Sequence, residues 1–438
     1  MRLAVKFKRM FKSYQTLIAI ICILVFITTR NVLVITSSGV SIEKEQANEI
    51  SGEGNFIHID ESELHIPNKG KPIYNDVKLV VLHSTGDENF SNANFAGCPD
   101  YNCMLSTNLL LASFADAIII HRNAIPLQFK QFGYEPLKKH QKIVLFGLES
   151  PVNEKLSFTY SFTLSNVFTQ SYRMDTDFPT PYGYMVKRKT PLTTQSQLSN
   201  ISVLSAQKQY KIAWIASNCG THSKRESYVA QLRKYISVHQ FGQCKWSGND
   251  DIATANEPTF HCPRYNSGCE RKIAMEYYFY LAFENSICQD YVSEKFWRFI
   301  ELIVPIVLKR EIVAKVAPAR SFIAADDFEN ARQLGDYLQY LIANPREYAK
   351  YFDWMTEYKS VFLNGGHHGV TERPWGFCQL CHKLQNPPQL KVPYWKTLNS
   401  NGSRLDLENW WNQKCDTTLV NRLNKNLNDE AVTTGPTS

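Results

Sequence analysis

The polar residues that follow one apolar run indicate a phosphate-binding site. Tyr277–Phe283 is unbroken aromatic and apolar sequence, as in a strand buried on both faces, and Glu284 is the first polar residue after it. Ser293 is placed to cap a helix that begins with Glu294 and Lys295 and continues through Ile300. A helix N-terminus at the carboxyl end of a strand offers free N–H groups to a phosphate. Lys295 opposes the helix dipole there, and an anion between them would explain its position.

Glu149 is the candidate general base. It ends a predicted strand, Lys142–Glu149, and is followed by Ser150 and Pro151. It therefore lies at the carboxyl end of a strand, where ligands bind in α/β sheets. The pattern alone fits an exposed glutamate at a turn equally well. At such a position a carboxylate can take the proton from an attacking hydroxyl group.

The stretch FYLAFENS, followed by DYVSEKFW, resembles the donor-site signature of the α1,3-fucosyltransferases, glycosyltransferase family 10. The segments PARSFIAADDF and YAKYFDW resemble the same family's C-terminal signature. The resemblance implies inverting transfer of L-fucose from GDP-β-L-fucose, in α1,3 linkage, to GlcNAc of a glycoprotein or oligosaccharide glycan. It leaves open whether the acceptor is the core GlcNAc of an N-glycan or an outer, lactosamine-type antenna.

The same resemblance assigns residues. Leu148-Glu149-Ser150-Pro151 matches the position of the family's proposed catalytic glutamate, and SNCGTHSKRESYV resembles a family element with Ser-Asn, Arg and Tyr. The donor-binding residues that it implies are Ser217, Asn218, Arg225, Asn285, Tyr291, Glu294 and Lys295. Arg225 and Lys295 would hold the diphosphate. Lys309 is a departure, because many members have glycine there.

Asp175-Thr176-Asp177 offers an alternative chemistry, since paired carboxylates bind hard cations such as manganese in another class of glycosyltransferase. It lies in SYRMDTDFPTPYG, which resembles a family stretch that needs no metal. We therefore expect no metal ligands and no obligatory cofactor, with a divalent cation at most as a stimulant. The alternatives are a D-x-D, manganese-dependent lumenal glycosyltransferase, which EDTA would inactivate, and an inactive lumenal lectin or scaffold, which Glu149→Gln would leave unimpaired.

The elements around these residues alternate as in an α/β protein with largely parallel sheets. Predicted strands are Val77–His83, Ala117–His121, Lys142–Glu149, Lys211–Ser217, Tyr277–Phe283 and, less clearly because of Pro305, Ile303–Leu308. Predicted helices are Leu105–Phe114, Arg225–Val238, Asp326–Leu341 with an Asp326–Glu329 capping pair, and one that begins at Asn344-Pro345. Phe158–Gly183 is less regular. The resemblance implies that the two α/β units are Rossmann-like domains facing across a cleft, the GT-B arrangement.

The N-terminus has the pattern of a membrane anchor. Five basic residues precede the apolar stretch 16–35, which is about as long as a spanning helix requires. They supply most of the net charge of +7, so that the remaining chain is nearly neutral and has no nucleic-acid footprint. We expect a single-pass type II protein of the Golgi membrane with a lumenal catalytic part. The predicted divisions are a cytoplasmic tail (1–15), an anchor (16–35), a stem (36–72), an acceptor-side domain (73–200), a GDP-fucose domain (201–365) and a disulfide-tied extension (366–438).

Cysteines and glycosylation signals agree with a lumenal setting. Of eleven cysteines, one lies in the predicted anchor, and the others can form up to five disulfides. Cys378-x-x-Cys381 lacks the second close pair of a zinc site and the surroundings of a redox pair. The resemblance implies instead that Cys98 and Cys103 are joined to Cys378 and Cys381, in a pairing that the sequence does not decide. Three sequons begin at Asn89, Asn200 and Asn401.

Overall fold

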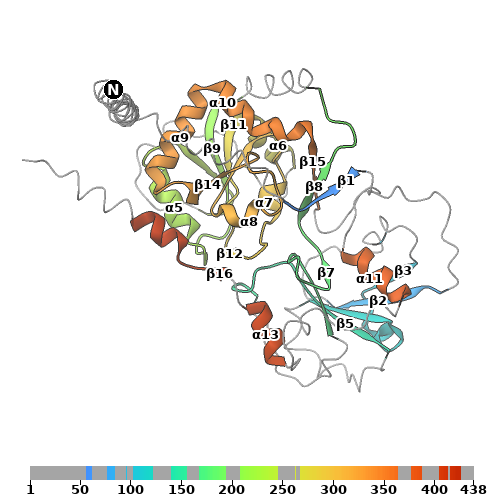
Figure 1. Ribbon diagram of the computed structural model, residues 1–438. Coiled ribbons are helices and arrows are strands. Elements are labelled where there is room, and N and C mark those ends of the chain that lie inside the picture. The colour runs from blue at the N-terminus through green and yellow to red at the C-terminus, as the bar shows by residue number, and fades with distance from the viewer. Residues whose placement is uncertain are drawn as a thin grey trace, which may run out of the picture. The chain divides into compact units, whose positions relative to one another are not determined.

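The computed structural model describes residues 56–61, 76–83, 95, 102–121, 140–154, 167–193, 208–244, 262, 267–363, 376–386, 404–412 and 415–425 (Figure 1). The predicted tail and anchor, most of the predicted stem, Cys98 and the sequons at Asn89, Asn200 and Asn401 lie outside these residues. Within the described residues, no helix is long and apolar enough to cross a membrane. The described chain is an α/β fold with two main parallel sheets.

The first sheet has six parallel strands in the order β3-β2-β4-β5-β6-β7. Its strands are β2 (Lys78–His83), β3 (Cys103–Ser106), β4 (Ala117–His121), β5 (Lys142–Gly147), β6 (Val167–Ser171) and β7 (Phe178–Pro179). The predicted strands at β2, β4 and β5 are confirmed, because their apolar residues are buried on both faces of the sheet. Glu149 comes two residues after the end of β5, at the carboxyl edge.

The second sheet has five parallel strands in the order β10-β9-β11-β13-β14. Its strands are β9 (Tyr210–Ile215), β10 (Val238–Phe241), β11 (Tyr277–Leu281), β13 (Val304–Val307) and β14 (Ile323–Ala324). The helical elements of this half are α5 (Arg225–Leu232), α6 (Ser267–Glu276), α7 (Glu294–Trp297), α8 (Arg310–Val313), η6 (Ala325–Asp327), α9 (Ala331–Ala343), α10 (Pro345–Ala349) and η7 (Lys350–Thr356). The predicted strand that carries Pro305 is confirmed as β13.

A third sheet joins β1 (His58–Asp60), β8 (Gly183–Lys187) and β15 (Tyr358–Phe362) in the order β1-β8-β15. β1 falls within the range 36–72, for which the sequence indicates a flexible stem. Phe56 packs edge-on against Tyr358, with ring centroids 5.0 Å apart, and Glu61 Oε1 lies 2.7 Å from Lys359 Nζ. Residues 56–61 are therefore part of the folded body.

We expect a soluble 73–438 fragment to be less stable than a 55–438 fragment, because it lacks β1 and Phe56. Burying one aromatic side chain contributes about 1.5–3 kcal/mol. The melting temperature should therefore fall by about 2–4 °C, as measured by differential scanning fluorimetry. Glu61→Gln in the longer fragment is the control, since a partly exposed ion pair contributes at most about 1 kcal/mol. Equal melting temperatures of the two fragments would show that β1 adds nothing.

Two predicted helices are shorter than expected. Within the predicted helix Leu105–Phe114, the first two residues belong to β3, which ends at Ser106. Only Leu109–Phe114 is helical, as the 3₁₀ helix η3. It begins there because the Asn108 side chain accepts a hydrogen bond from the Leu110 amide. The helix predicted over Arg225–Val238 ends at Leu232, and the β-branched Val238 begins β10.

The cap of α9 was also wrongly predicted. Asn330 accepts hydrogen bonds from the Arg332 and Gln333 amides, so the helix begins at Ala331 rather than Asp326. Asp326 lies in η6 and accepts the Arg310 amide instead. The predicted helix at Pro345 is confirmed as α10.

The C-terminal residues pack onto both main sheets. Helix α11 (Gly376–Gln385) lies against β2 and β7, α13 (Arg404–Asn412) contributes Leu407, Trp410 and Trp411 to a core with β4 and β5, and β16 (Cys415–Asp416) pairs with β12 (Ile287–Cys288). The disulfides are Cys103–Cys381, Cys219–Cys244, Cys262–Cys269 and Cys288–Cys415. The Cys103–Cys381 bond joins two of the cysteines that the family resemblance ties together, and Cys378 is also disulfide-bonded.

Candidate active site

The carboxyl end of β11 carries the first group of candidate residues. Phe279 and Leu281 are buried, and the polar residues Glu284, Asn285 and Ser286 follow where the strand ends. Ser293 caps α7 as predicted, since its hydroxyl accepts a hydrogen bond from the Lys295 amide. Helix α7 is shorter than predicted, because it ends at Trp297 and continues only as turns.

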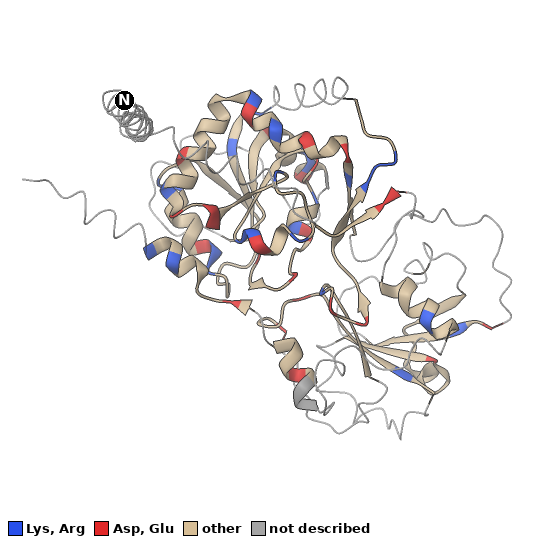
Figure 2. Cartoon of the chain, viewed as in Figure 1, with Lys and Arg blue, Asp and Glu red and all other residues tan. Residues whose placement is uncertain are grey.

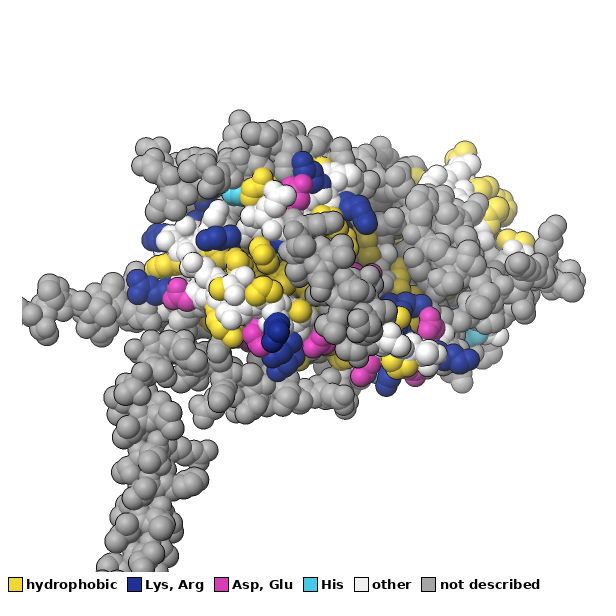
Figure 3. Space-filling model, turned by 90° about the horizontal axis from the view of Figure 1, so that it is seen from above, with side chains coloured by type: hydrophobic (Ala, Val, Ile, Leu, Met, Phe, Trp, Pro, Cys, Tyr) yellow, Lys and Arg dark blue, Asp and Glu magenta, His cyan; other side chains and the backbone are white. Residues whose placement is uncertain are grey.

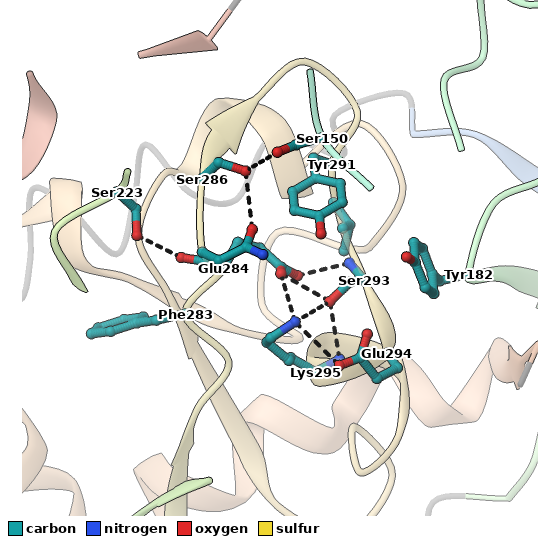
Figure 4. Close-up of polar contacts among 12 residues, drawn as sticks. Ser150, Tyr182, Ser223, Phe283, Glu284, Ser286, Tyr291, Ser293, Glu294 and Lys295 are labelled. Carbon is teal, nitrogen blue, oxygen red and sulfur yellow. Dashed lines mark hydrogen bonds and ion pairs between the residues drawn. The ribbon is translucent and has the colours of Figure 1, made fainter. Parts of the chain in front are cut away.

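Lys295 lies in a compact cluster of charges with Glu284 and Glu294 (Figure 4). Its Nζ is 3.1 Å from Glu284 Oε2, 3.1 Å from Glu294 Oε1 and 2.8 Å from Ser293 Oγ. Glu284 also accepts hydrogen bonds from the Ser293 amide and hydroxyl. The lysine is therefore held in place by three partners at the start of α7.

Burial and pairing act in opposite directions on the pKa values of this cluster. Burial raises the pKa of Glu284. It also acts to raise the pKa of Glu294, but the positive charges of Lys295 and Arg298 outweigh it and lower that pKa to about 2. Burial lowers the pKa of Lys295, and the two carboxylates more than compensate, so that the pKa ends above its ordinary value. Lys295 is thus a fixed positive charge at neutral pH.

Arg225 is at the first position of α5, as predicted, but its guanidinium is directed at the protein backbone. Nη1 donates to the Phe283 carbonyl at 2.5 Å and Nη2 to the Asn218 carbonyl at 3.2 Å. The residue is 2% exposed, and burial lowers its pKa. Arg225 thereby joins the end of β11 to the loop that begins at Ser217, in which Ser217 and Asn218 are exposed.

Glu149 reaches residues that follow β11. Its Oε2 accepts hydrogen bonds from Tyr291 Oη at 3.1 Å, Asn285 Nδ2 at 3.3 Å and Asn153 Nδ2 at 3.1 Å. Next to it, Ser286 Oγ donates to Ser150 Oγ at 2.5 Å, as Figure 4 shows. Residues 136 positions or more apart are therefore in direct contact. The structure brings the candidate base into contact with two of the candidate donor-binding residues, Asn285 and Tyr291.

A pocket opens at the carboxyl ends of β11 and β13. Its walls are largely apolar, and its polar members are Glu284, Ser286, Tyr291 and Lys309. The apolar lining is Ala282, Ile287, Val292, Phe296, Val307, Leu308, Ile312 and Val313. The pocket thus combines an apolar lining with a few polar groups, one of them a cation.

Asp175 and Asp177 are engaged within the six-stranded half. Arg173 holds Asp175 with two hydrogen bonds, at 2.7 and 2.6 Å, and Asp177 accepts the Thr169 amide and hydroxyl, both at 2.8 Å. In the part of the chain that the structure describes, no group of three or more metal-ligating side chains could hold an ion.

Charged side chains are mixed in sign. Basic and acidic residues are both scattered over the ribbon in Figure 2, and Figure 3 shows them interspersed on the described part of the face that it displays. Among the described residues that these two views draw, basic side chains are not gathered into one patch.

Several residues of the site were given no role from the sequence. Glu284 is the main partner of Lys295, Ser150 and Ser286 join the two sheets, and Tyr182 donates to the Leu148 carbonyl beside Glu149. For Glu284 a signal existed, because a glutamate directly after a buried strand needs a cation. The serine pair has no local signal, since each serine alone fits a turn.

The chain is similar to known proteins. The family described as glycosyltransferase family 10 (fucosyltransferase), C-terminal part, matches residues 205–400, and fucosyltransferase, N-terminal, matches residues 75–183. Alpha-(1,3)-fucosyltransferase fut-1 of Caenorhabditis elegans is 37% identical over 79% of this chain and 72% of its own length. Glycoprotein 3-alpha-L-fucosyltransferase A of Drosophila melanogaster is 33% identical over 72% of this chain and 56% of its own length.

A solved structure, described as a crystal structure of alpha1,3-fucosyltransferase, is 16% identical and covers 77% of this chain and 97% of its own, with a TM-score of 0.45. Both parts of the family description and the nematode relative cover most of the folded body. The chain therefore belongs to glycosyltransferase family 10 and is an α1,3-fucosyltransferase.

Proposed function

We propose that the protein transfers L-fucose from GDP-β-L-fucose, with inversion, to O3 of GlcNAc in a glycoprotein or oligosaccharide glycan. The observation that carries the proposal is the contact of the Glu149 carboxylate with Asn285 and Tyr291, next to the Lys295 cluster. A proton acceptor and a fixed cation are the two groups that a single displacement on a sugar nucleotide requires.

In this mechanism Glu149 takes the proton from the acceptor hydroxyl group while the oxygen of that hydroxyl group attacks C1 of fucose. The bond from C1 to the diphosphate oxygen breaks, and GDP leaves. Lys295 stabilises the negative charge that develops on the diphosphate. Arg225 acts indirectly, by fixing the end of β11 through the Phe283 carbonyl. No step needs a metal, and a divalent cation would at most stimulate.

We also propose that the two main sheets belong to two Rossmann-like domains in a GT-B arrangement, with the acceptor-side domain over 73–200 and the GDP-fucose domain over 201–365. Two parallel sheets whose carboxyl ends supply Glu149 and Asn285 support this. The disulfides support a lumenal catalytic part, because such bonds persist in oxidising compartments. Together, the disulfides and the apolar stretch 16–35 favour a type II protein of the Golgi membrane.

The test is transfer of labelled fucose from GDP-fucose by the purified chain to a panel of core N-glycan and lactosamine-type acceptors. We expect α1,3-fucosylated products on at least one class, with activity that survives EDTA. The class that is labelled identifies the acceptor. A folded protein that transfers to none of the panel would refute the proposed reaction, and complete loss of activity in EDTA would favour a manganese-dependent mechanism.

A further inference from the structure

Lys309 is a basic residue of the pocket to which the family resemblance assigns no role. It follows the end of β13 and precedes α8, so its side chain starts at the carboxyl edge of the five-stranded sheet. Of the described residues that line the pocket, it is the one basic side chain. The lining of the same pocket also includes Glu284 and Tyr291. A cation at one edge of an apolar pocket is a suitable partner for the anionic part of a bound nucleotide.

Lys309 is held less tightly than Lys295. Its Nζ lies 3.5 Å from Glu311 Oε2 and 3.5 Å from Asp416 Oδ2, beyond the usual length of a hydrogen bond from an ammonium group. Lys295 has three partners within 3.1 Å. Exchanging a carboxylate for a phosphate therefore disturbs fewer favourable contacts at Lys309 than at Lys295.

Asp416 belongs to a segment that we call the C-terminal strap, Cys415–Lys425. The strap is fixed at its start by the Cys288–Cys415 disulfide and by the pairing of β16 with β12. Its helical residues, dark red beside α5 in Figure 1, bury Leu419, Val420 and Leu423 in the core of the five-stranded sheet. The strap lies beyond residues 205–400, where the family description ends.

Two further contacts fix the strap at the start of α5. Asn421 accepts a hydrogen bond from Lys224 Nζ at 3.3 Å, and Asn424 Nδ2 donates to Ser227 Oγ at 2.9 Å. Asp416 itself is firmly placed, because its Oδ1 accepts the amides of Thr418 and Leu419. Its other oxygen is directed at Lys309 and Arg422. A rigid carboxylate therefore determines where the Lys309 ammonium lies at the edge of the pocket.

We propose that Lys309 binds the diphosphate of the donor nucleotide, and that Asp416 of the C-terminal strap positions it. The inference rests on the proposed function, since it assigns the pocket to a nucleoside diphosphate. On binding, the Lys309 ammonium exchanges the exposed Glu311 carboxylate for a phosphate oxygen and stays beside Asp416, a shift that its flexible side chain allows. Lys309 and Lys295 then share the negative charge of the leaving diphosphate.

The test is equilibrium binding of GDP and of guanosine to the full chain and to Lys309→Met. Lys309→Met should bind GDP at least about tenfold more weakly, the loss of one charge-assisted contact, and should bind guanosine within about twofold of the wild type. Lys309→Arg should recover most of the GDP affinity. Equal GDP affinity in Lys309→Met would overturn the inference, as would an equal loss of guanosine affinity, which would place Lys309 against the base.

Asp416→Asn tests the positioning role, because asparagine can still cap the strap helix. It should weaken GDP binding about threefold in the wild type and leave Lys309→Met unchanged, as a double-mutant cycle requires for coupled residues. Glu311→Gln is the matched control, since Glu311 is equally distant from Lys309 but 71% exposed, and should have no effect. Equal effects of Asp416→Asn in both backgrounds would contradict positioning. A wild-type chain that binds no GDP would instead refute the proposed function.

Discussion

Glu149→Gln is expected to lower kcat for fucose transfer by about 10²–10⁴-fold, the usual contribution of a positioned general base. Glutamine keeps the size of the side chain and can still accept hydrogen bonds from Tyr291 and Asn285, but it cannot take up the proton of the acceptor hydroxyl. Donor binding should therefore change little. The measurements are initial rates over a range of acceptor concentrations and the equilibrium affinity for GDP.

The control is Glu154→Gln, the same substitution in the turn that follows Glu149. The Glu154 backbone carbonyl accepts the Trp411 indole N–H, and this contact does not depend on the side chain. The Glu154→Gln variant should therefore keep full activity. Transfer by Glu149→Gln at more than about a tenth of the wild-type rate would exclude Glu149 as the base, and a loss of GDP affinity equal to the loss of rate would make it a structural residue.

The strands that the sequence predicts are those whose buried residues are almost all apolar. β4 and β11 are runs of branched and aromatic residues, and both are buried in the sheets. β6 was missed, because VFTQS contains the polar residues Thr169, Gln170 and Ser171, which are as buried as its apolar ones. Their hydrogen bonds come from later residues, such as Asp177 for Thr169 and Thr180 for Gln170. A hydropathy pattern does not reveal such partners.

In the site, too, contacts between residues that are close in the sequence could be predicted, and contacts between distant residues could not. Ser293, Glu294 and Lys295 interact within one short stretch, so their local geometry follows from helix-capping rules. The contact between Glu149 and Asn285 depends on where two sheets place the ends of β5 and β11. The partners of Arg225 were unexpected for a related reason: the carbonyls of Phe283 and Asn218 become available only when the chain leaves two neighbouring strands.

Lys295→Met is expected to destabilise the folded protein by about 3–5 kcal/mol, because it leaves buried carboxylates without their cation. The side chain of Glu284 is 12% exposed and that of Glu294 is 32% exposed, and both lie 3.1 Å from the lysine. Methionine fills a similar volume, so packing alone should cost little. The measurement is the free energy of unfolding in urea at pH 7, together with GDP affinity, which should also fall.

The double variant Glu284→Gln/Lys295→Met separates stability from donor binding. With the less exposed carboxylate neutralised, most of the lost stability should return, whereas GDP affinity and transfer should not. Recovery of transfer would mean that Lys295 does not hold the diphosphate, and failure to recover stability would mean that the carboxylates are not the cause of the defect.

Acid should partly rescue the single variant for the same electrostatic reason. In the wild type, Lys295 and Arg298 outweigh burial and lower the pKa of Glu294 from its ordinary value of 4.5 to about 2. The stabilisation that this pairing provides is complete above pH 4.5 and is lost as the pH falls toward 2. Without Lys295, burial instead raises the pKa values of the Glu284 and Glu294 carboxyl groups. As the pH falls, these groups are therefore protonated in the variant before they are in the wild type, which removes the buried charge that destabilises the variant. The difference in unfolding free energy between the wild type and Lys295→Met should therefore be smaller at pH 4 than at pH 7. A difference that does not change with pH would show that Lys295 stabilises the fold through packing rather than charge.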